Sequence, residues 1–322
     1  MPIPVRPIDI SFSKSVAGYR APCLITTAAG VGALFNVSRS DSIILHSFVT
    51  IRKYLFASRE SSKLHIDKCY SSVKSMKKIG WFTTARGPGS LNLYNTIIER
   101  IDSGDIKAEL AFVFINRDIK DNSYRAEIVN SAEERGIPVV ILPSDTFEPD
   151  LKKRDMTAWR NKYGEKLREK IDCYQMDFGV LAGYMLIFDD ATCIKYPLIN
   201  LHPALPDTYK GTWMEIVGQV IDNNDECYGS MVHICSPELD RGDTIAYDSF
   251  PVSSVVGDGN RDERIQNVRA EESRREAPLL METIKMLVNG EISLRDGHLY
   301  DSEGRRMKEY PCLADRINSK IN

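Results

Sequence analysis

The sequence lacks the patterns that mark membrane, repeat or low-complexity proteins. Its longest mostly apolar stretch, Ala21 to Phe35, is interrupted by Thr and Gly and is too short to span a bilayer. Basic residues precede that stretch, but its distance from Met1 argues against a signal peptide. Internal repeats and biased segments are also missing from the sequence. We therefore expect a globular protein that does not need a membrane partner.

Cysteine and histidine occur without the spacings of disulfide frameworks or metal sites. The seven cysteines are an odd number and contain no Cys-x-x-Cys pair. The five histidines are dispersed along the chain and lack ligand spacing. We expect free thiols, a reducing cytoplasmic location and no metal ion.

Neither acidic nor basic residues are in large excess. The sequence has 42 basic and 45 acidic residues, interleaved along the chain, and a formal net charge of −3. A nucleic-acid-binding protein usually concentrates positive charge on one face or segment. The balance therefore argues against nucleic acid as an obligate partner.

With 322 residues the chain is longer than one average domain. Residues 1–76 begin with three prolines and give no clear pattern beyond a possible strand at 23–27, so they are expected to form an amino-terminal extension of unassigned structure. Residues 77–290 carry a regular pattern and are expected to form the catalytic domain. Residues 291–322 contain Asp296-Gly297 between short apolar runs, which predicts a small hairpin followed by a tail.

From residue 79 onward, short apolar runs alternate with segments of helical spacing. Strands are expected at 79–85, 110–115, 137–142, 178–181, 198–201, 230–236 and 244–252. Helices are expected at 91–104, 124–135, 150–170, 212–224 and 261–288. Continuous apolar strands that alternate with helices predict an α/β fold with a doubly wound, mostly parallel sheet covered on both faces.

A glycine-rich turn, Arg86-Gly87-Pro88-Gly89-Ser90, follows the first strand of this pattern and precedes a helix. Such a turn aims free backbone N–H groups at an anion. Pro88 removes one donor, so the turn matches neither the Rossmann nor the Walker pattern. Gly87, Gly89 and Ser90 are candidate phosphate-binding residues, and a plain tight turn is the alternative.

Three polar residues stand out from the apolar background between Asp177 and Asp243. Asn200 and His202 are two apart at the end of an apolar run, so a strand would place them on one face. Asp240 lies in a turn directly after another such run. An amide, an imidazole and a carboxylate suit acyl transfer, in which an oxyanion is stabilised and a proton moves.

Each of these residues also has a purely structural interpretation. His202 could be a core histidine, Asn200 could cap the strand, and Asp240 could build the turn. His233 lies within an apolar run, where core packing or support of a site residue is expected rather than chemistry. Trp213 is expected in the core or in a pocket wall.

Residues 79 to about 290 resemble the glycinamide ribonucleotide formyltransferase branch of the folate-dependent formyltransferases. The resemblance rests on four motifs in order: the Gly-Pro-Gly-Ser loop, LAGYM, INLHPALP with a following glycine, and GSMVHICSPELDRGD. It implies a Rossmann-like formyltransferase topology. It also implies transfer of a formyl group from 10-formyltetrahydrofolate to a primary amine, most simply that of glycinamide ribonucleotide in purine biosynthesis.

The resemblance also assigns roles to residues. Asn200, His202 and Asp240 fall on the catalytic positions, and Gly87, Gly89 and Ser90 on the phosphate loop. The folate slot falls on Leu181, Gly183, Met185, Cys235 and Glu238. A ribose-contacting carboxylate is expected near Glu271 or Glu272. The implied partners are the folate cosubstrate and a phosphorylated small-molecule amine, without a metal ion.

The sequence departs from the resemblance at several positions and leaves alternatives open. Leu186 stands where many relatives have Arg, and Pro88 where many have Asn. A formyltetrahydrofolate deformylase, a sugar-nucleotide N-formyltransferase and an inactive folate-binding regulator are the alternative functions. The amino-terminal extension could cover the sheet edge, mediate homodimerisation or reshape the acceptor pocket.

Overall fold

The computed structural model describes residues 23–26, 32–35, 76–120, 122–238 and 241–321. The chain divides into two units, Met1–Lys74 and Ser75–Asn322, which are considered separately. In the first unit, β1 (Cys23–Thr26) pairs with β2 (Gly32–Phe35) in an antiparallel register, which confirms the strand predicted there. The other expectations for residues 1–76 lie outside the described residues, and the expected domain boundaries stay a prediction.

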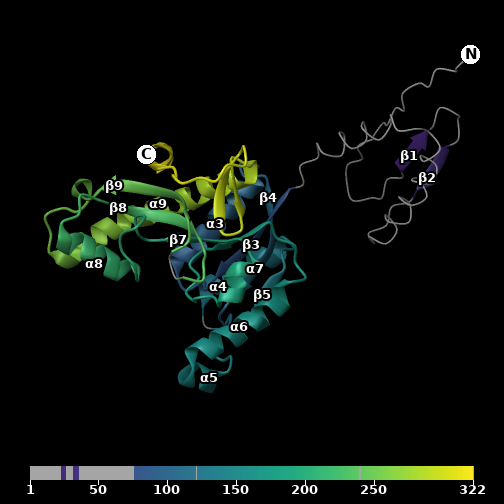
Figure 1. The fold of residues 1–322 in the computed structure, drawn as a ribbon, viewed down its shortest axis with the longest axis horizontal. Helices are drawn as coiled ribbons and strands as arrows, with labels where there is room; N and C mark the ends of the chain where they lie inside the picture. Colours follow the sequence, from purple (N-terminus) through teal and green to yellow (C-terminus); the bar gives the residue numbers. More distant parts are fainter. Residues whose placement is uncertain (1–22, 27–31, 36–75, 121, 239–240, 322) are drawn as a thin grey trace, which may run out of the picture. The chain divides into compact units, whose positions relative to one another are not determined.

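The second unit is built around a seven-stranded sheet of order β5-β4-β3-β6-β7-β8-β9 (Figure 1). Neighbours from β5 to β7 are parallel, whereas β8 is antiparallel to both β7 and β9. The mostly parallel sheet predicted from the sequence is confirmed. Its strands are β3 (Lys77–Thr83), β4 (Ala108–Ile115), β5 (Val139–Ile141), β6 (Phe178–Leu181), β7 (Leu198–His202), β8 (Cys227–Ile234) and β9 (Thr244–Pro251).

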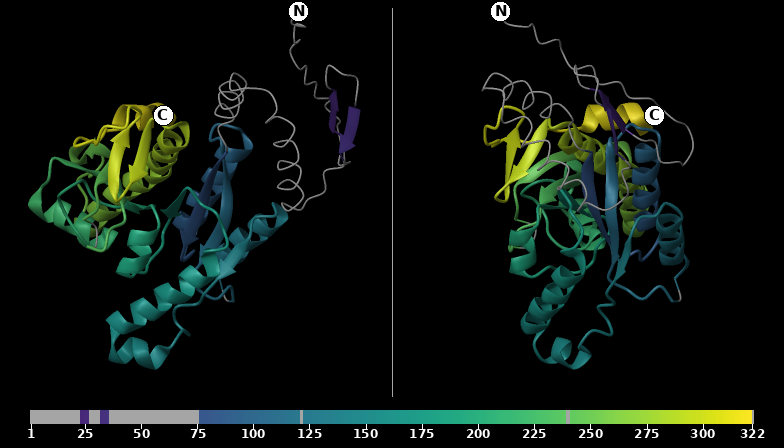
Figure 2. Two further views of the ribbon diagram at one scale, coloured as in Figure 1. Left: turned by 45° about the vertical axis from the view of Figure 1, so that its right-hand side comes forward. Right: turned by 90° about the vertical axis from the view of Figure 1, so that its right-hand side faces the viewer.

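Helices cover both faces of this sheet (Figure 2). One face packs against α3 (Pro88–Asp102), α4 (Ser123–Glu134) and the long α9 (Arg261–Asn289), and the other packs against α6 (Met156–Ile171). A third cluster forms where α8 (Trp213–Asn223) and the start of α9 meet β8 and β9. This layering is the doubly wound arrangement that the sequence predicts.

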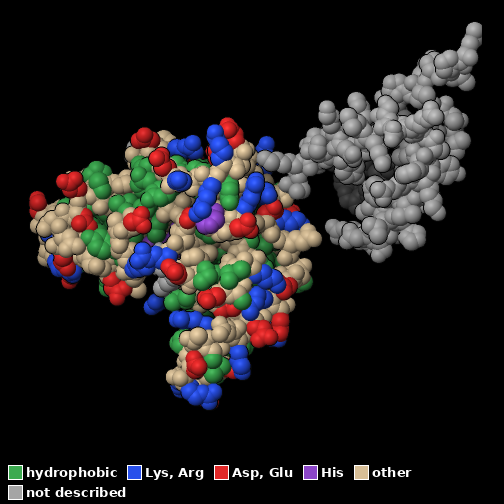
Figure 3. Space-filling view, in the orientation of Figure 1, with side chains coloured by type: hydrophobic (Ala, Val, Ile, Leu, Met, Phe, Trp, Pro, Cys, Tyr) green, Lys and Arg blue, Asp and Glu red, His purple; other side chains and the backbone are tan. Residues whose placement is uncertain are grey.

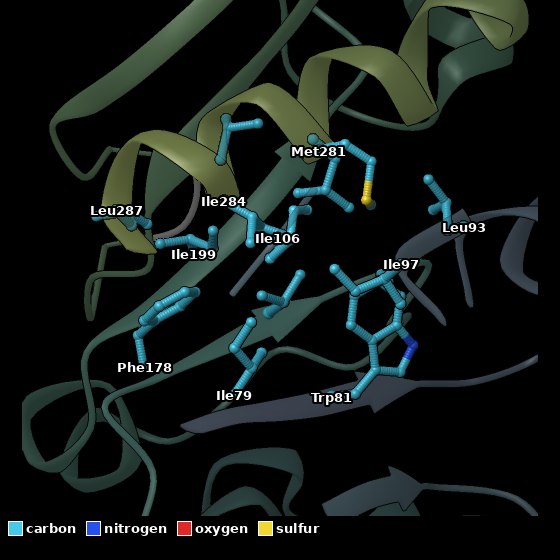
Figure 4. Packing of buried hydrophobic residues seen from close by; sticks show 14 of the residues in the cluster. Ile79, Trp81, Leu93, Ile97, Ile106, Phe178, Ile199, Met281, Ile284 and Leu287 are labelled. Atoms are coloured by element: carbon cyan, nitrogen blue, oxygen red, sulfur yellow. The ribbon is translucent and has the colours of Figure 1, made fainter. Parts of the chain in front are cut away.

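The alternation of side chains along β3 shows how one strand serves two cores. Ile79 and Trp81 belong to the cluster with α3 and α9, whereas Phe82 belongs to the cluster with α6. Figure 4 shows Trp81 and Ile79 facing the buried side of α9, from which Met281 and Ile284 project. Truncating one such buried Ile or Leu side chain to Ala typically costs about 2–5 kcal/mol.

The region expected to form one helix at 150–170 forms two. A short helix, α5 (Pro149–Arg154), ends before α6 begins, and Asp155 between them is extended. The carboxylate of Asp155 accepts a hydrogen bond from the backbone N–H of Ala158 at 3.0 Å. Asp at this position prefers to cap a new helix rather than continue one, so the charged pattern concealed a boundary.

The carboxy-terminal segment forms the predicted hairpin. β10 (Ile292–Arg295) and β11 (His298–Asp301) pair antiparallel, and the two turn residues Asp296 and Gly297 have φ values of 50° and 74°. Positive φ at both positions is what an Asp-Gly hairpin turn requires. The chain then passes β9, where Leu313 N–H donates to Tyr247, and ends in α10 (Ala314–Ile321).

The surface agrees with the interleaved charge of the sequence. On the face shown in Figure 3, acidic and basic side chains of the described residues are intermixed. Among those residues we find no helix with the length and apolar character to cross a membrane.

Candidate active site

A cleft of about 1020 Å³ opens where β3, β6 and β7 end. Ligands of open α/β sheets bind at the carboxyl ends of parallel strands, and this cleft lies there. Residues from three stretches at these strand ends line it: 86–90 after β3, 181–188 at the end of β6 and 200–203 at the end of β7. The cleft therefore gathers the turn, the LAGYM segment and the Asn-x-His motif into one site.

Asn200, near the end of β7, is hydrogen-bonded to His233 on the neighbouring strand β8. The Nδ2 of Asn200 lies 3.1 Å from Nε2 of His233, while Nδ1 of His233 lies 3.0 Å from the carbonyl oxygen of Ile234. Because a carbonyl can only accept, Nδ1 of His233 carries the proton and Nε2 accepts from the Asn200 amide. His233 is 2% exposed and thus fixes the orientation of the amide in the cleft.

His202 lines the same cleft as Asn200, as the two-residue spacing predicts. It is 4% exposed, and its ring stands at 90° to that of His233 with the centroids 5.9 Å apart. Its Nε2 lies 3.4 Å from the carbonyl oxygen of Tyr209 in the loop after β7. The parallel strand therefore delivers an amide and an imidazole side by side.

Asp240, the third candidate, lies outside the described residues. The stems of its loop are described, and both are held by backbone hydrogen bonds. Cys235 N–H donates to Leu198 at 2.8 Å, and Ile234 N–H donates to Asp243 at 3.0 Å. A Cβ atom on Gly242 would lie 1.8 Å from the Ile234 carbonyl oxygen, so this stem requires glycine.

The residues assigned to the folate slot form an uncharged lobe of the cleft. Leu181, Gly183, Met185 and Cys235 all line it, whereas Glu238 is exposed and does not. The folate contact predicted for Glu238 stays a prediction. Burial raises the pKa of the neighbouring Cys193 thiol to about 11, so this residue too is uncharged near pH 7.

Gly183 joins this lobe to the glycine-rich turn. It has a φ of +65°, and a Cβ atom there would lie 2.4 Å from the Ser90 hydroxyl oxygen. Its carbonyl accepts from Thr84 N–H at 3.1 Å, and the Thr84 hydroxyl accepts from Met185 N–H at 2.8 Å. A side chain at Gly183 would therefore disturb both parts of the cleft.

The glycine-rich turn forms the start of α3. Gly87 is the N-cap residue, without a side-chain cap, and Pro88 occupies the first turn. Leu91 N–H donates to the Gly87 carbonyl at 3.4 Å. The partial positive charge of a helix N-terminus and its unpaired N–H groups favour an anion. Gly87, Gly89 and Ser90 line the cleft at this point.

A charged wall formed by Trp213, Arg269 and Glu276 completes the cleft. Trp213 was expected in the core or in a pocket wall, whereas Arg269 and Glu276 were not identified from the sequence. The Arg269 guanidinium lies 5.2 Å from the Trp213 ring centroid, and its Nη1 lies 2.8 Å from Glu276 and 2.7 Å from Glu272. The sequence signal that could have identified this part of the cleft is the Arg-x-x-Glu-x-x-x-Glu spacing, which puts Arg269, Glu272 and Glu276 on one face of a helix.

Neither acidic residue expected at the ribose lines the cleft. Glu271 pairs with Arg274 and Arg275, while Glu272 is 1% exposed and accepts a hydrogen bond from the Ser230 hydroxyl at 2.9 Å. Burial, and then the charge of Glu276, raise the pKa of Glu272 to about 7. Among the described residues, Glu215 and Glu276 are the acidic residues that line the cleft, and the ribose contact stays a prediction.

Among the described residues, no group of three or more His, Cys, Asp or Glu side chains is arranged to hold a metal ion. The chemistry available in the described cleft is that of an oriented amide, a buried imidazole and a helix N-terminus. Such groups stabilise developing negative charge and move protons.

Comparison with known proteins identifies the family. The family described as formyl transferase matches residues 87–273. A phosphoribosylglycinamide formyltransferase from Escherichia coli is 28% identical over 221 residues, which cover 68% of this chain and 92% of that protein. A formyltetrahydrofolate deformylase from another Escherichia coli strain is 29% identical over 95 residues, covering 29% of this chain and 33% of that protein.

Solved structures agree on the fold. A phosphoribosylglycinamide formyltransferase from Coxiella burnetii superposes with a TM-score of 0.57 at 20% identity, covering 74% of this chain and all of that one. The family match includes the glycine-rich turn from Gly87 onward, the Asn-x-His strand and the first part of α9, and it spans more than half of the 322 residues. The chain therefore belongs to the formyl transferase family.

Proposed function

We propose that this enzyme transfers the formyl group of 10-formyltetrahydrofolate to the primary amine of glycinamide ribonucleotide. The observation that carries the proposal is the shared cleft of Asn200, His202 and the α3 N-terminus. This combination brings groups for acyl transfer next to a site suited to a phosphate. Two relatives named phosphoribosylglycinamide formyltransferases, which match 68% and 70% of this chain, support the same acceptor.

Formyl transfer makes specific demands on the protein. The reaction forms an amide bond to the acceptor nitrogen, breaks the bond between the formyl carbon and the folate nitrogen, and moves one proton from the amine to that nitrogen. The Asn200 amide, oriented by His233, donates a hydrogen bond to the oxygen that becomes negative. His202 in its protonated form adds a second donor, and Asp240 balances its charge and relays the amine proton.

The two lobes of the cleft suit the two substrates. The uncharged lobe, with Leu181, Gly183, Met185 and Cys235, presents apolar side chains and backbone groups to a pterin ring. The Gly87–Ser90 turn offers backbone N–H groups to the acceptor phosphate. Arg269 and Glu276 present a donor and an acceptor to the acceptor hydroxyls between these ends.

A hydrolase is the second candidate, because a deformylase is among the relatives. That relative matches a much smaller share of this chain than the transferases do. An enzyme whose acceptor is water does not need a phosphate-binding turn or a charged wall beside its catalytic residues. The glycine-rich turn and the charged wall both line the cleft here, which favours an acceptor larger than water.

The test is an absorbance assay of folate deformylation with purified protein and 10-formyltetrahydrofolate, run with and without glycinamide ribonucleotide. We expect tetrahydrofolate to be released only when the ribonucleotide is present. Release at the same rate without it would establish the hydrolase instead. A second acceptor, an amino sugar nucleotide, distinguishes the remaining transferase alternative, and turnover with it alone would overturn the choice of acceptor.

A further inference from the structure

We propose that Tyr209 is a positioning residue for the catalytic histidine, His202. Its backbone carbonyl fixes the protonation pattern of the imidazole, and its side-chain hydroxyl anchors that carbonyl to α8. This inference rests on the proposed role of His202 in formyl transfer and adds to it the device that sets the histidine.

The contact between the two residues determines which ring nitrogen carries the proton. Nε2 of His202 lies 3.4 Å from the carbonyl oxygen of Tyr209, and a carbonyl can only accept. For this contact to be a hydrogen bond Nε2 must carry a proton, so we assign the neutral ring as the Nε2–H tautomer and the second proton of the charged ring to Nδ1. The distance is long for a hydrogen bond, as is common for catalytic groups before substrate binds.

The side-chain hydroxyl of Tyr209 is also held by hydrogen bonds. Its hydroxyl donates to the Asp225 carboxylate at 2.6 Å and accepts from the Asn223 side-chain amide at 2.8 Å. The hydrogen bond to Asp225 raises the pKa of the Tyr209 hydroxyl, as expected for a hydroxyl that donates to a carboxylate.

The anchor for this hydroxyl is itself rigid. Asp225 directly follows the carboxyl end of α8, where Asn224 takes the left-handed conformation with a φ of 53°. The Asp225 N–H donates to the Val220 carbonyl at 3.0 Å, and that of Asn224 donates to the Ile221 carbonyl at 3.2 Å. These are the paired hydrogen bonds that close a helix end, so α8 supplies a fixed point.

The loop between β7 and α8 has a second, independent tyrosine contact. The hydroxyl of Tyr228 on β8 donates to the Pro203 carbonyl at 2.7 Å. Pro203 is adjacent to His202 in sequence, but the hydroxyl of Tyr228 does not contact the carbonyl that faces Nε2. Comparing substitutions at Tyr228 and Tyr209 therefore separates a general effect on loop stability from a specific effect on the His202 imidazole.

Tyr209→Phe removes the hydroxyl and keeps the ring, and Tyr228→Phe is the matched control. We expect Tyr209→Phe to lower kcat about tenfold, which corresponds to about 1.4 kcal/mol of lost transition-state stabilisation, within the range for a typical net hydrogen bond. The KM for the folate should change by less than about twofold, because the folate lobe is formed by other segments. Asp225→Asn, whose amide oxygen still accepts the hydroxyl, should retain most of the activity.

The direct readout is the ¹⁵N spectrum of histidine in the full chain without substrates, with His202→Gln identifying the signal. Wild type and Tyr228→Phe should show His202 as the Nε2–H tautomer when neutral, whereas Tyr209→Phe should show a mixture of tautomers. An Nδ1–H tautomer in wild type, or identical spectra and kcat in wild type and Tyr209→Phe, would overturn the proposal. Because the spectrum needs no acceptor, a wrong acceptor in the proposed function leaves this test intact.

Discussion

The two ends of the cleft are built in different ways. The proposed catalytic end comes from two adjacent strands, β7 and β8, whose register alone places Asn200 opposite His233. The proposed acceptor end collects the turn at the start of α3, the start of α8 and the face of α9, which are far apart in sequence. A local motif therefore suffices to specify the chemistry, whereas the acceptor site depends on how distant helices pack. Variants that affect only one end test this division.

The largest effect is expected at the catalytic end. Replacing Asn200 by Ala removes an oriented oxyanion donor and should lower kcat about 100- to 1,000-fold. Replacing His202 by Ala should lower kcat by a similar or larger factor, because proton transfer is lost as well. Steady-state kinetics at saturating substrates measure both. Unchanged turnover in one of these variants would exclude the substituted residue from catalysis.

A substitution at Gly183, which joins the uncharged lobe to the glycine-rich turn, should disturb substrate binding at both ends of the cleft. Gly183→Ala forces an alanine into the left-handed conformation and places its Cβ against the Ser90 hydroxyl. The backbone strain costs about 1–2 kcal/mol, and we expect the KM values of both substrates to rise. Gly104→Ala is the control, because its φ is +76° but nothing lies within 4 Å of the added Cβ. If both variants lose stability equally and keep normal KM values, the contact with Ser90 is unimportant for binding.

The charged wall should affect the acceptor alone. Glu276→Gln keeps the shape of the side chain and removes its charge, so we expect the KM for the ribonucleotide to rise about tenfold, the equivalent of about 1.4 kcal/mol. The KM for 10-formyltetrahydrofolate should not change. Glu271→Gln is the matched control, since Glu271 pairs with arginines outside the cleft. Equal effects of the two substitutions would remove Glu276 from the acceptor site.

The smallest effect is on stability and concerns Glu272, which lies behind this wall. Its pKa is raised from 4.5 to about 7, so the folded protein binds this proton more tightly than the unfolded chain. The contribution of this group to the free energy of unfolding therefore falls as pH rises from about 4.5 to about 7. Glu272→Gln should remove about 1–2 kcal/mol of that pH dependence.

Urea unfolding at several pH values measures this dependence. Glu99→Gln serves as the control, because Glu99 is exposed on α3. The same pH dependence in wild type and Glu272→Gln would show that the group titrates normally in the folded protein.

The same division explains what the sequence could predict. Continuous apolar runs such as Phe178–Leu181 predicted buried parallel strands, and the two-residue spacing predicted that Asn200 and His202 share a face. Both are backbone properties of a single strand. Arg269 and Glu276 could not be placed, because their role depends on the way α9 crosses β8. The sequence did not predict the helix boundary at Asp155, because this residue, which prefers to cap a helix, lies within a stretch of charged residues with helical spacing.

The central claim is that the groups at the ends of β7 and β8 move a formyl group between two bound substrates. The most direct measurement follows a ¹³C-labelled formyl carbon by NMR, with wild-type protein, 10-formyltetrahydrofolate and glycinamide ribonucleotide, beside the Asn200→Ala variant. We predict that the label appears as a formamide carbon on the ribonucleotide and that the variant slows its appearance at least about 100-fold. Label recovered as free formate, or transferred equally fast by the variant, would contradict the account.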